Sequence, residues 1–324
     1  MQSKVPFVQI GSENGFHAPL GMGCSFYGIN QWDGEEVERI LASMELALES
    51  NVTHFDTAEG YGNGESERLI RRFIAADSSR RERMFIASKA NLQDFTAEAM
   101  LKSIDASRKR LQTDVIDLYY LHWAHKGKDL RPVMEGLETA KQTGKIRAIG
   151  VSNFSVEHMQ QASEVTKIDA HQLGYSLLWR FPEKEIIPYC LENDIAVVVY
   201  SALAHGILAA KYERQLQFQA HDQRWSILHF RDDVWSNLYE SLEQFKAIVQ
   251  DSNHSPVELA LGWLLQQKGV TAVLASAKNP DQLLANAAVL NCDIAPHILD
   301  ALTGFSNDAM SHIPDEGNPF GYYP

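Results

Sequence analysis

The sequence predicts an α/β protein of the (β/α)8 TIM-barrel class, folded as a single domain over residues 1–324. Short apolar runs rich in β-branched residues alternate with segments of helical periodicity along the chain. These runs are almost continuously apolar, as in parallel strands that are buried on both faces. A length of 324 residues is normal for one barrel with insertions. Eight alternating units favour a closed barrel with right-handed crossovers, and a doubly wound open sheet is the alternative.

The strands and helices follow from local patterns. The predicted strands are Pro19–Cys24, Thr53–Ala58, Met84–Ala90, Val115–His122, Ile146–Asn153, Asp169–Tyr175, Ile195–Ala202 and Thr271–Ala277. Apolar residues recur at 3.6-residue spacing over residues 35–49, which predicts a helix there. Thr96 is the predicted N-cap of a helix that runs to Leu111, and Ser255-Pro256 is predicted to open another.

Three segments lie outside the eight strand–helix units of a simple barrel. Val5–His17 is predicted to form an N-terminal hairpin that plugs the bottom of the barrel. Lys211–Asp251 is a long loop between the seventh and eighth strands, and it predicts either a binding lid or an extra helix packed outside. Met310–Pro324 combines Pro, Gly and aromatic residues, which predicts a C-terminal arm docked on the barrel.

Composition excludes several classes of function. The formal net charge of −13 argues against nucleic acid as a partner, because phosphate binding needs a basic face. The three cysteines are widely separated and form neither a disulfide framework nor a CxxC metal motif, which favours a reducing compartment. No signal-peptide core or membrane-spanning apolar run is visible in the sequence. We therefore expect a cytoplasmic protein without a membrane partner, and no pattern predicts its oligomeric state.

Four residues that could serve carbonyl chemistry come at neighbouring strand ends: Asp56, Tyr61, Lys89 and His122. The carboxyl ends of barrel strands form the active face of this fold. A tyrosine can protonate the oxygen of a carbonyl that accepts hydride, and a lysine beside it lowers the tyrosine pKa. A histidine can orient the carbonyl. Taken singly, each residue also fits a structural role, such as an N-cap, a solvent-exposed lysine, a core histidine or a packed tyrosine.

The motifs around these residues resemble those of the aldo-keto reductase family. They are Phe55-Asp56-Thr57-Ala58-x-x-Tyr61-Gly62-x-Gly64-x-Ser66-Glu67, Ser88-Lys89, Asp117 to Trp123, and Gly144 to Phe154. The resemblance runs from about residue 5 to residue 290, in the family's order. It implies a (β/α)8 barrel and a catalytic tetrad in which Tyr61 is the general acid, Lys89 and Asp56 tune it, and His122 orients the carbonyl. It implies no metal ion.

The resemblance also implies a nicotinamide cofactor site. Ser152, Asn153 and Gln172 would bind the carboxamide, and Tyr200 would stack on the nicotinamide ring. The remaining predicted cofactor residues are Gly23, Cys24, Ser201, Leu203, Gly206, Lys211, Ser276, Lys278, Gln282 and Asn286. Lys278 suits the 2′-phosphate of NADPH, so NADPH is favoured over NADH. Ser276 and Ala285 depart from the family's usual Gly and acidic residue.

Tyr27, Trp123 and Trp179 are the candidate substrate-pocket residues, with Trp225 or Trp235 as further possibilities. An aromatic pocket suits small aldehydes, sugars or aromatic aldehydes, and the sequence does not choose among them. The sequence therefore predicts reduction of aldehydes or ketones to alcohols by an NADPH-dependent enzyme. One alternative is a cofactor-binding sensor or regulatory subunit of slow turnover. Another is an unrelated barrel enzyme, which would need paired carboxylates or metal ligands.

Overall fold

A closed barrel of eight parallel strands forms the centre of the computed structural model, which describes residues 8–11, 16–27, 34–219 and 222–320. In chain order the strands are β3 (Leu20–Gly23), β4 (His54–Asp56), β5 (Phe85–Ala90), β6 (Ile116–Leu121), β7 (Ile146–Ser152), β8 (Ala170–Gly174), β9 (Ala196–Tyr200) and β10 (Val270–Ala275). Each strand pairs with the next along the chain, and β10 closes the ring against β3. The open-sheet alternative is thereby excluded.

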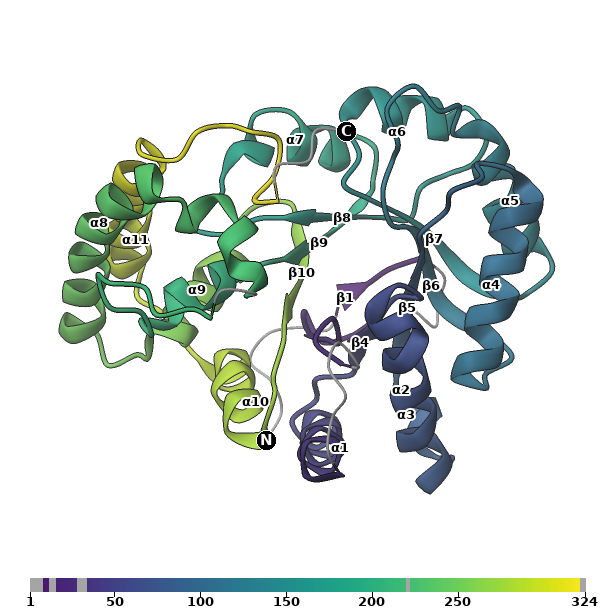
Figure 1. The fold of residues 1–324 in the computed structure, drawn as a ribbon, viewed down its shortest axis with the longest axis horizontal. Coiled ribbons are helices and arrows are strands. Elements are labelled where there is room, and N and C mark those ends of the chain that lie inside the picture. The colour runs from purple at the N-terminus through teal and green to yellow at the C-terminus, as the bar shows by residue number, and fades with distance from the viewer. Residues whose placement is uncertain (1–7, 12–15, 28–33, 220–221, 321–324) are drawn as a thin grey trace.

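Helices surround this barrel (Figure 1). They are α1 (Gly34–Glu49), α2 (Glu65–Ala76), α3 (Arg80–Arg83), α4 (Ala97–Leu111), α5 (Arg131–Gln142), α6 (Val156–Ser163), α7 (Ile186–Glu192), α8 (Asp232–Asp251), α9 (Pro256–Leu265), α10 (Pro280–Ala287) and α11 (Pro296–Met310). Short 3₁₀ turns are η1 (Tyr61–Gly64), η2 (Phe181–Glu183), η3 (Ala204–Ala209), η4 (Gln223–Ser226), η5 (Leu228–Phe230) and η6 (Ala288–Asn291).

The predicted helix starts are confirmed by their caps. The Thr96 side chain accepts a hydrogen bond from the Ala99 amide at the start of α4. At the start of α9, the Ser255 hydroxyl accepts from the Glu258 amide and the Glu258 carboxylate accepts from the Ser255 amide, which forms a capping box. Side chains there satisfy amides that have no partner within the helix.

The predicted N-terminal hairpin is present over its described part. Strands β1 (Val8–Gln9) and β2 (Phe16–His17) pair antiparallel. The buried Ile10 packs among barrel residues at the beginnings of the strands, including Phe85 and Ala148. The hairpin therefore seals the end of the barrel opposite the strand carboxyl ends, although residues 5–7 and 12–15 of the prediction lie outside the described residues.

The long segment between β9 and β10 contains the predicted extra helix, and a role of its loop as a binding lid stays a prediction. Its second half is the helix α8, which packs outside the barrel against α11 (Figure 1). Its first half is irregular, and Tyr212 ties it to η3 by donating a hydrogen bond of 2.7 Å to the His205 carbonyl. The segment is thus a helix on the outer layer joined to a loop at the barrel rim.

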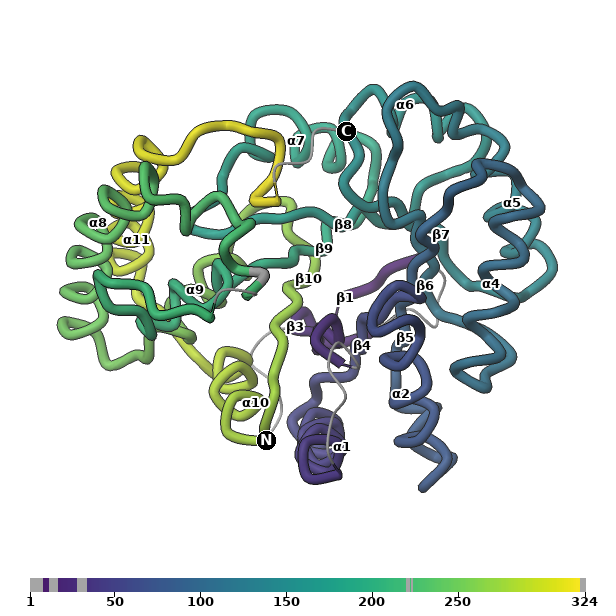
Figure 2. The backbone as a smooth tube through the Cα atoms, in the orientation of Figure 1, coloured from purple at the N-terminus to yellow at the C-terminus, as the bar shows by residue number. Residues whose placement is uncertain are grey.

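The C-terminal arm follows α11 and returns towards the barrel (Figure 2). The Leu228 amide donates to the Pro319 carbonyl at 3.0 Å, and Arg231 pairs with Glu316 at 2.8 Å. These contacts place Phe320 beside Tyr200 at the end of β9, with ring centroids 6.2 Å apart. The arm is docked as predicted up to residue 320, and residues 321–324 lie outside the described part.

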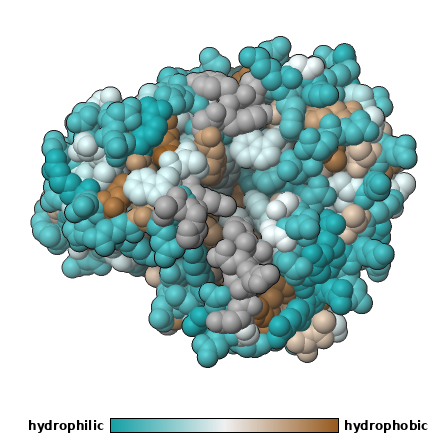
Figure 3. Space-filling view, viewed as in Figure 1, coloured by the Kyte–Doolittle hydropathy of each residue, from teal (hydrophilic) through white to brown (hydrophobic). Residues whose placement is uncertain are grey.

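Hydrophilic residues cover most of the face shown in Figure 3, and the hydrophobic patches on it are small. Within the described residues, every helix is too short or too polar to cross a membrane.

Candidate active site

The four predicted catalytic residues lie at the carboxyl ends of three adjacent strands. Asp56 is the last residue of β4, Lys89 lies near the end of β5, and His122 follows β6. Tyr61 begins η1, the turn that follows β4. Because parallel strands of a barrel end at the same rim, this topology brings together residues that are separated by up to 66 positions in the sequence.

Lys89 and Asp56 form an ion pair inside the barrel. The Lys89 ammonium donates to the Asp56 carboxylate and, at 2.8 Å, to the Thr57 carbonyl. Both side chains are buried, so each charge depends on the other. Burial alone would lower the pKa of Lys89, but the charge of Asp56 raises it above its ordinary value. Lys89 is therefore a cation fixed beside the reaction centre.

Tyr61 receives the third hydrogen bond of Lys89. The Lys89 ammonium lies 3.4 Å from the Tyr61 hydroxyl oxygen and donates to it. Burial raises the pKa of Tyr61, and the charge of Lys89 opposes this only in part. The pKa of Tyr61 is therefore raised, whereas the charge of Lys89 alone would lower it, because the effect of desolvation in the barrel is larger than that of the charge. Tyr61 thus keeps its proton at neutral pH, as a general acid must.

His122 faces Tyr61 at the rim. The two rings meet edge to face with centroids 5.7 Å apart. Burial lowers the pKa of His122 well below its ordinary value, and the Lys89 charge lowers it further. The imidazole is therefore neutral at neutral pH, and it can donate one hydrogen bond to an oxygen without adding a charge. Trp123 stacks against His122, with centroids 5.6 Å apart.

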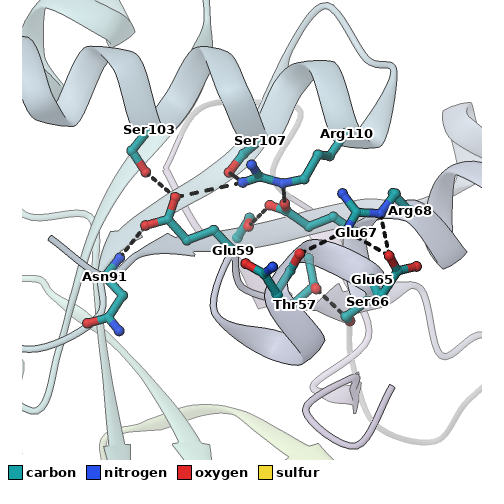
Figure 4. A network of polar contacts seen from close by, with 12 residues as sticks. Thr57, Glu59, Glu65, Ser66, Glu67, Arg68, Asn91, Ser103, Ser107 and Arg110 are labelled. Carbon is teal, nitrogen blue, oxygen red and sulfur yellow. Dashed lines mark hydrogen bonds and ion pairs between the residues drawn. The ribbon is translucent and has the colours of Figure 1, made fainter. Parts of the chain in front are cut away.

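A partly buried polar network supports the turn that carries Tyr61 (Figure 4). Glu59 precedes this turn and accepts hydrogen bonds from the Asn91 amide and the Ser103 hydroxyl, both at 2.6 Å. Glu67 follows it, and its carboxylate accepts from Arg110 and from Ser88, which is the neighbour of Lys89. The network fixes both flanks of Tyr61 against β5 and α4.

We expect Arg110→Ala to lower the free energy of unfolding by about 2–3 kcal/mol, because the buried Glu67 carboxylate would lose its cation. The matched control is Arg68→Ala, which removes two exposed contacts, the ion pair with Glu65 and a hydrogen bond of 2.8 Å to the Asn63 carbonyl, and should cost at most about 1 kcal/mol. Urea unfolding followed by far-UV circular dichroism measures both. Equal losses in the two variants would contradict a supporting role for Glu67.

The residues predicted to bind the nicotinamide, three at its carboxamide and Tyr200 by stacking, lie next to the tetrad. Gln172, on β8, donates to the second Asp56 oxygen at 2.8 Å. Asn153, which follows β7, donates to the His122 carbonyl at 3.2 Å and to the Ser152 hydroxyl at 3.0 Å. The Tyr200 hydroxyl donates to the Asn153 side-chain oxygen at 2.6 Å. The structure therefore joins these four residues to the tetrad in one hydrogen-bonded group.

The remaining predicted cofactor residues form two groups in the structure. Ser201, Leu203 and Gly206 lie in the turn after β9, where Gly206 has φ +95° and a Cβ would approach the Tyr212 hydroxyl to 3.1 Å. Lys211 is an exposed residue just beyond this turn. Glycine at position 206 is thus required both by the backbone conformation and by the neighbouring side chain.

The second group lies where β10 meets β3. A Cβ on Gly23 would come within 2.8 Å of the Ser276 hydroxyl, so these two strand ends are in close contact. Asn286 donates to the Ser276 carbonyl at 3.3 Å, and the Gln282 side chain accepts from the Lys278 amide at 2.9 Å. Cys24 is fully buried, so its side chain lies in the core. Its backbone amide donates to the Asp56 carbonyl at 2.8 Å.

Lys278 itself is exposed, and its ammonium lies 4.7 Å from the centre of the Phe26 ring. Within the described residues, no carboxylate forms an ion pair with it.

The candidate substrate residues are not brought together. Trp123 is partly exposed at the rim, whereas Tyr27 and Trp179 belong to the core. Tyr27 donates to the Ala277 carbonyl, and Trp179 packs on Phe181. Trp225 is exposed on the long loop, and Trp235 is buried where that loop meets α8. Aromatic identity alone did not distinguish a rim position from a core position.

Two residues at the rim were not singled out from the sequence. Phe320 packs beside Tyr200 and meets His205 edge to face at 5.5 Å. His205 also lies within 3.4 Å of the Ser201 hydroxyl. The aromatic content of the C-terminal arm was the only signal for Phe320, and His205 lies in a turn without regular periodicity.

Comparison with known proteins gives consistent results. The model of the aldo/keto reductase family matches residues 19–305. The chain is 31% identical over 265 residues to an aldo-keto reductase [NADP(+)] of Schizosaccharomyces pombe, yakc, a match that covers 76% of each chain. It is 28% identical to the NADH-specific methylglyoxal reductase of Escherichia coli, over 85% of this chain and 90% of that one. The glycerol dehydrogenase AKR11B4 of Gluconobacter oxydans superposes with a TM-score of 0.85 at 25% identity, covering 92% and 94% of the two chains.

Proposed function

The chain belongs to the aldo/keto reductase family of oxidoreductases, and we propose that it reduces aldehydes or ketones to alcohols with NADPH, using Tyr61 as the general acid. The observation that carries the proposal is the buried Lys89 ammonium, which is paired with Asp56 and donates to the Tyr61 hydroxyl. A buried cation aimed at a tyrosine at the strand ends has a clear chemical use and a high desolvation cost.

The tetrad residues have distinct roles in this proposal. The bound nicotinamide supplies the hydride that reaches the carbonyl carbon. Tyr61 donates its hydroxyl proton to the carbonyl oxygen, and Lys89 stabilises the phenolate that remains. Neutral His122 donates a hydrogen bond to the same oxygen and orients it. Asp56 holds Lys89 charged and in position.

The residues around the tetrad fit a nicotinamide. The Asn153 amide and the Tyr200 hydroxyl are linked at the rim, so a carboxamide can exchange hydrogen bonds with the pair. Tyr200 ends β9 and is partly exposed at the rim, where its ring could stack on that of a nicotinamide. Ser152, Asn153, Gln172 and Tyr200 would hold a nicotinamide at this rim, next to Tyr61.

The choice of NADPH rests on Lys278. Within the part of the chain that the structure describes, Lys278 forms no ion pair with a carboxylate. Its charge is therefore suited to the 2′-phosphate, which NADPH carries and NADH lacks. The relatives differ in this respect, since one is named for NADP(+) and another is named as NADH-specific.

We expect Lys278→Ala to weaken NADPH binding by about 10- to 100-fold and to leave NADH binding unchanged, because one hydrogen bond to a charged group is lost. Quenching of tryptophan fluorescence measures both dissociation constants. Lys268→Ala is the matched control, since Lys268 is an exposed lysine that precedes β10 whereas Lys278 follows it. An equal loss for the two cofactors would contradict the assignment of Lys278 to the 2′-phosphate.

The reaction is tested by following NADPH oxidation at its absorbance band with methylglyoxal, glyceraldehyde and an aromatic aldehyde. Methylglyoxal and glyceraldehyde are chosen because one relative is named a methylglyoxal reductase and another a glycerol dehydrogenase. Turnover with at least one carbonyl is the expected result. Tight NADPH binding without turnover of any of them would favour a cofactor-binding sensor instead.

A further inference from the structure

A group of three possible metal ligands lies in the outer helical layer, away from the elements that carry the tetrad. Among the described residues, His254, Glu258 and Cys292 bring their ligand atoms within 4.8 Å of one another. His254 lies between α8 and α9, Glu258 in the first turn of α9, and Cys292 between η6 and α11. All three side chains are half-buried, so an ion can reach them from solvent.

The three donors are held by their own local structure. The Glu258 carboxylate accepts from the Ser255 amide at 2.8 Å in the capping box, which uses one oxygen and fixes the carboxylate. The His254 amide donates to the Ser252 hydroxyl at 3.3 Å, and the Cys292 amide donates to the Val289 carbonyl at 3.1 Å. Little reorganisation is needed before an ion binds.

The distance between sulfur and nitrogen matches a shared ion. The Cys292 Sγ and the His254 Nδ1 are 3.2 Å apart. Two such atoms bound to one tetrahedral Zn²⁺, at about 2.3 Å and 2.0 Å, would be about 3.5 Å from each other. A carboxylate oxygen of Glu258 completes the group of three donors.

We propose that His254, Glu258 and Cys292 form a binding site for a borderline divalent cation, with Zn²⁺ as the preferred ion. Thiolate, imidazole and carboxylate together suit Zn²⁺ and exclude Mg²⁺ and Ca²⁺, which prefer oxygen ligands alone. Water fills the fourth position. The ion ties the loop between α8 and α9 to the segment that leads into α11.

Binding releases a proton. The Cys292 thiol gives its proton to solvent as the sulfur–zinc bond forms, and the His254 imidazole donates its Nδ1 lone pair. Affinity therefore falls as the pH is lowered. None of these residues belongs to the reductase machinery, so the site is independent of the proposed function.

The test uses untagged full-length protein, freed of metal by chelation and kept reduced. Isothermal titration with ZnCl₂ in two buffers of different ionisation enthalpy should give one ion per chain and the release of about one proton. Co²⁺ should produce a sulfur-to-cobalt charge-transfer band. A rise in the midpoint of thermal unfolding should accompany Zn²⁺ binding, because the ion binds the folded state.

Three variants assign the ligands. Cys292→Ser and His254→Gln should each weaken Zn²⁺ binding more than about tenfold, and Cys292→Ser should abolish the cobalt band. Glu258→Gln keeps the capping box, because glutamine also serves at that position, but loses the anionic ligand. Its Zn²⁺ affinity should fall while its stability without metal is retained.

Asp293→Asn is the control for charge, and Cys190→Ser is the control for a thiol elsewhere in the chain. Both should bind Zn²⁺ as the wild type does. Absence of stoichiometric binding by the wild type would overturn the proposal, as would equal affinity in the wild type and Cys292→Ser. In either case the pair of Cys292 and His254 is only a thiol–imidazole hydrogen bond.

Discussion

Replacement of Tyr61 by phenylalanine is expected to lower kcat for carbonyl reduction by about 10²- to 10⁴-fold, the usual contribution of a positioned general acid. The hydroxyl of Tyr61 is the atom that accepts the Lys89 hydrogen bond, and burial keeps it protonated by raising its pKa. The ring would remain opposite His122, so the shape of the site is retained. Stopped-flow or steady-state NADPH oxidation measures the loss.

Cofactor binding separates a chemical role from a structural one. The dissociation constant for NADPH should be unchanged in Tyr61→Phe, because the residues assigned to the cofactor are bonded to one another and to Asp56 rather than to Tyr61. Tyr189→Phe on α7 serves as the control and should retain full kcat. Full activity in Tyr61→Phe would show that another group supplies the proton.

The barrel was predictable from the sequence because its strands are buried on both faces. Strand β7 begins at the predicted Ile146, and β5 ends at the predicted Ala90. An apolar run of β-branched residues has few other stable environments. The same logic identified the rim, because residues that follow such runs lie at one end of the barrel. The tetrad could therefore be proposed before any distance was known.

Contacts between distant segments could not be predicted in this way. Gln172 reaches Asp56 across 116 positions, and Cys292 reaches His254 across 38. Local periodicity does not indicate which distant residue is contacted by a side chain at the end of a strand or in a loop. The same limit explains Tyr27 and Trp179, which the structure buries in the core, whereas Trp123 stays partly exposed at the rim.

The pKa of Tyr61 shows a further limit. The sequence indicated a neighbouring cation, but it did not indicate how deeply the hydroxyl is buried. Desolvation and the Lys89 charge act in opposite directions, and the first is larger. Only the three-dimensional arrangement determines the sign of that balance.

Replacement of Lys89 by methionine should lower the free energy of unfolding by about 3–5 kcal/mol, because the buried Asp56 carboxylate would be left without its cation. The two side chains are similar in length, so packing in the barrel changes little. Urea unfolding of Lys89→Met measures this loss, and kcat should fall as well because the Tyr61 phenolate loses its stabilising charge.

The double variant Lys89→Met/Asp56→Asn distinguishes the ion pair from packing. Asparagine removes the unpaired charge and can still accept the hydrogen bond of Gln172. The double variant should therefore be more stable than Lys89→Met alone, while its kcat remains low. If Asp56→Asn instead lowers the free energy of unfolding further, the unpaired charge of Asp56 is not what destabilises Lys89→Met. The ion pair would then not hold Lys89 in the way its geometry indicates. The expected result, recovery of stability without recovery of turnover, would show that the ion pair is retained for catalysis. A neutral pair then folds as well as the ion pair but cannot stabilise the tyrosine anion.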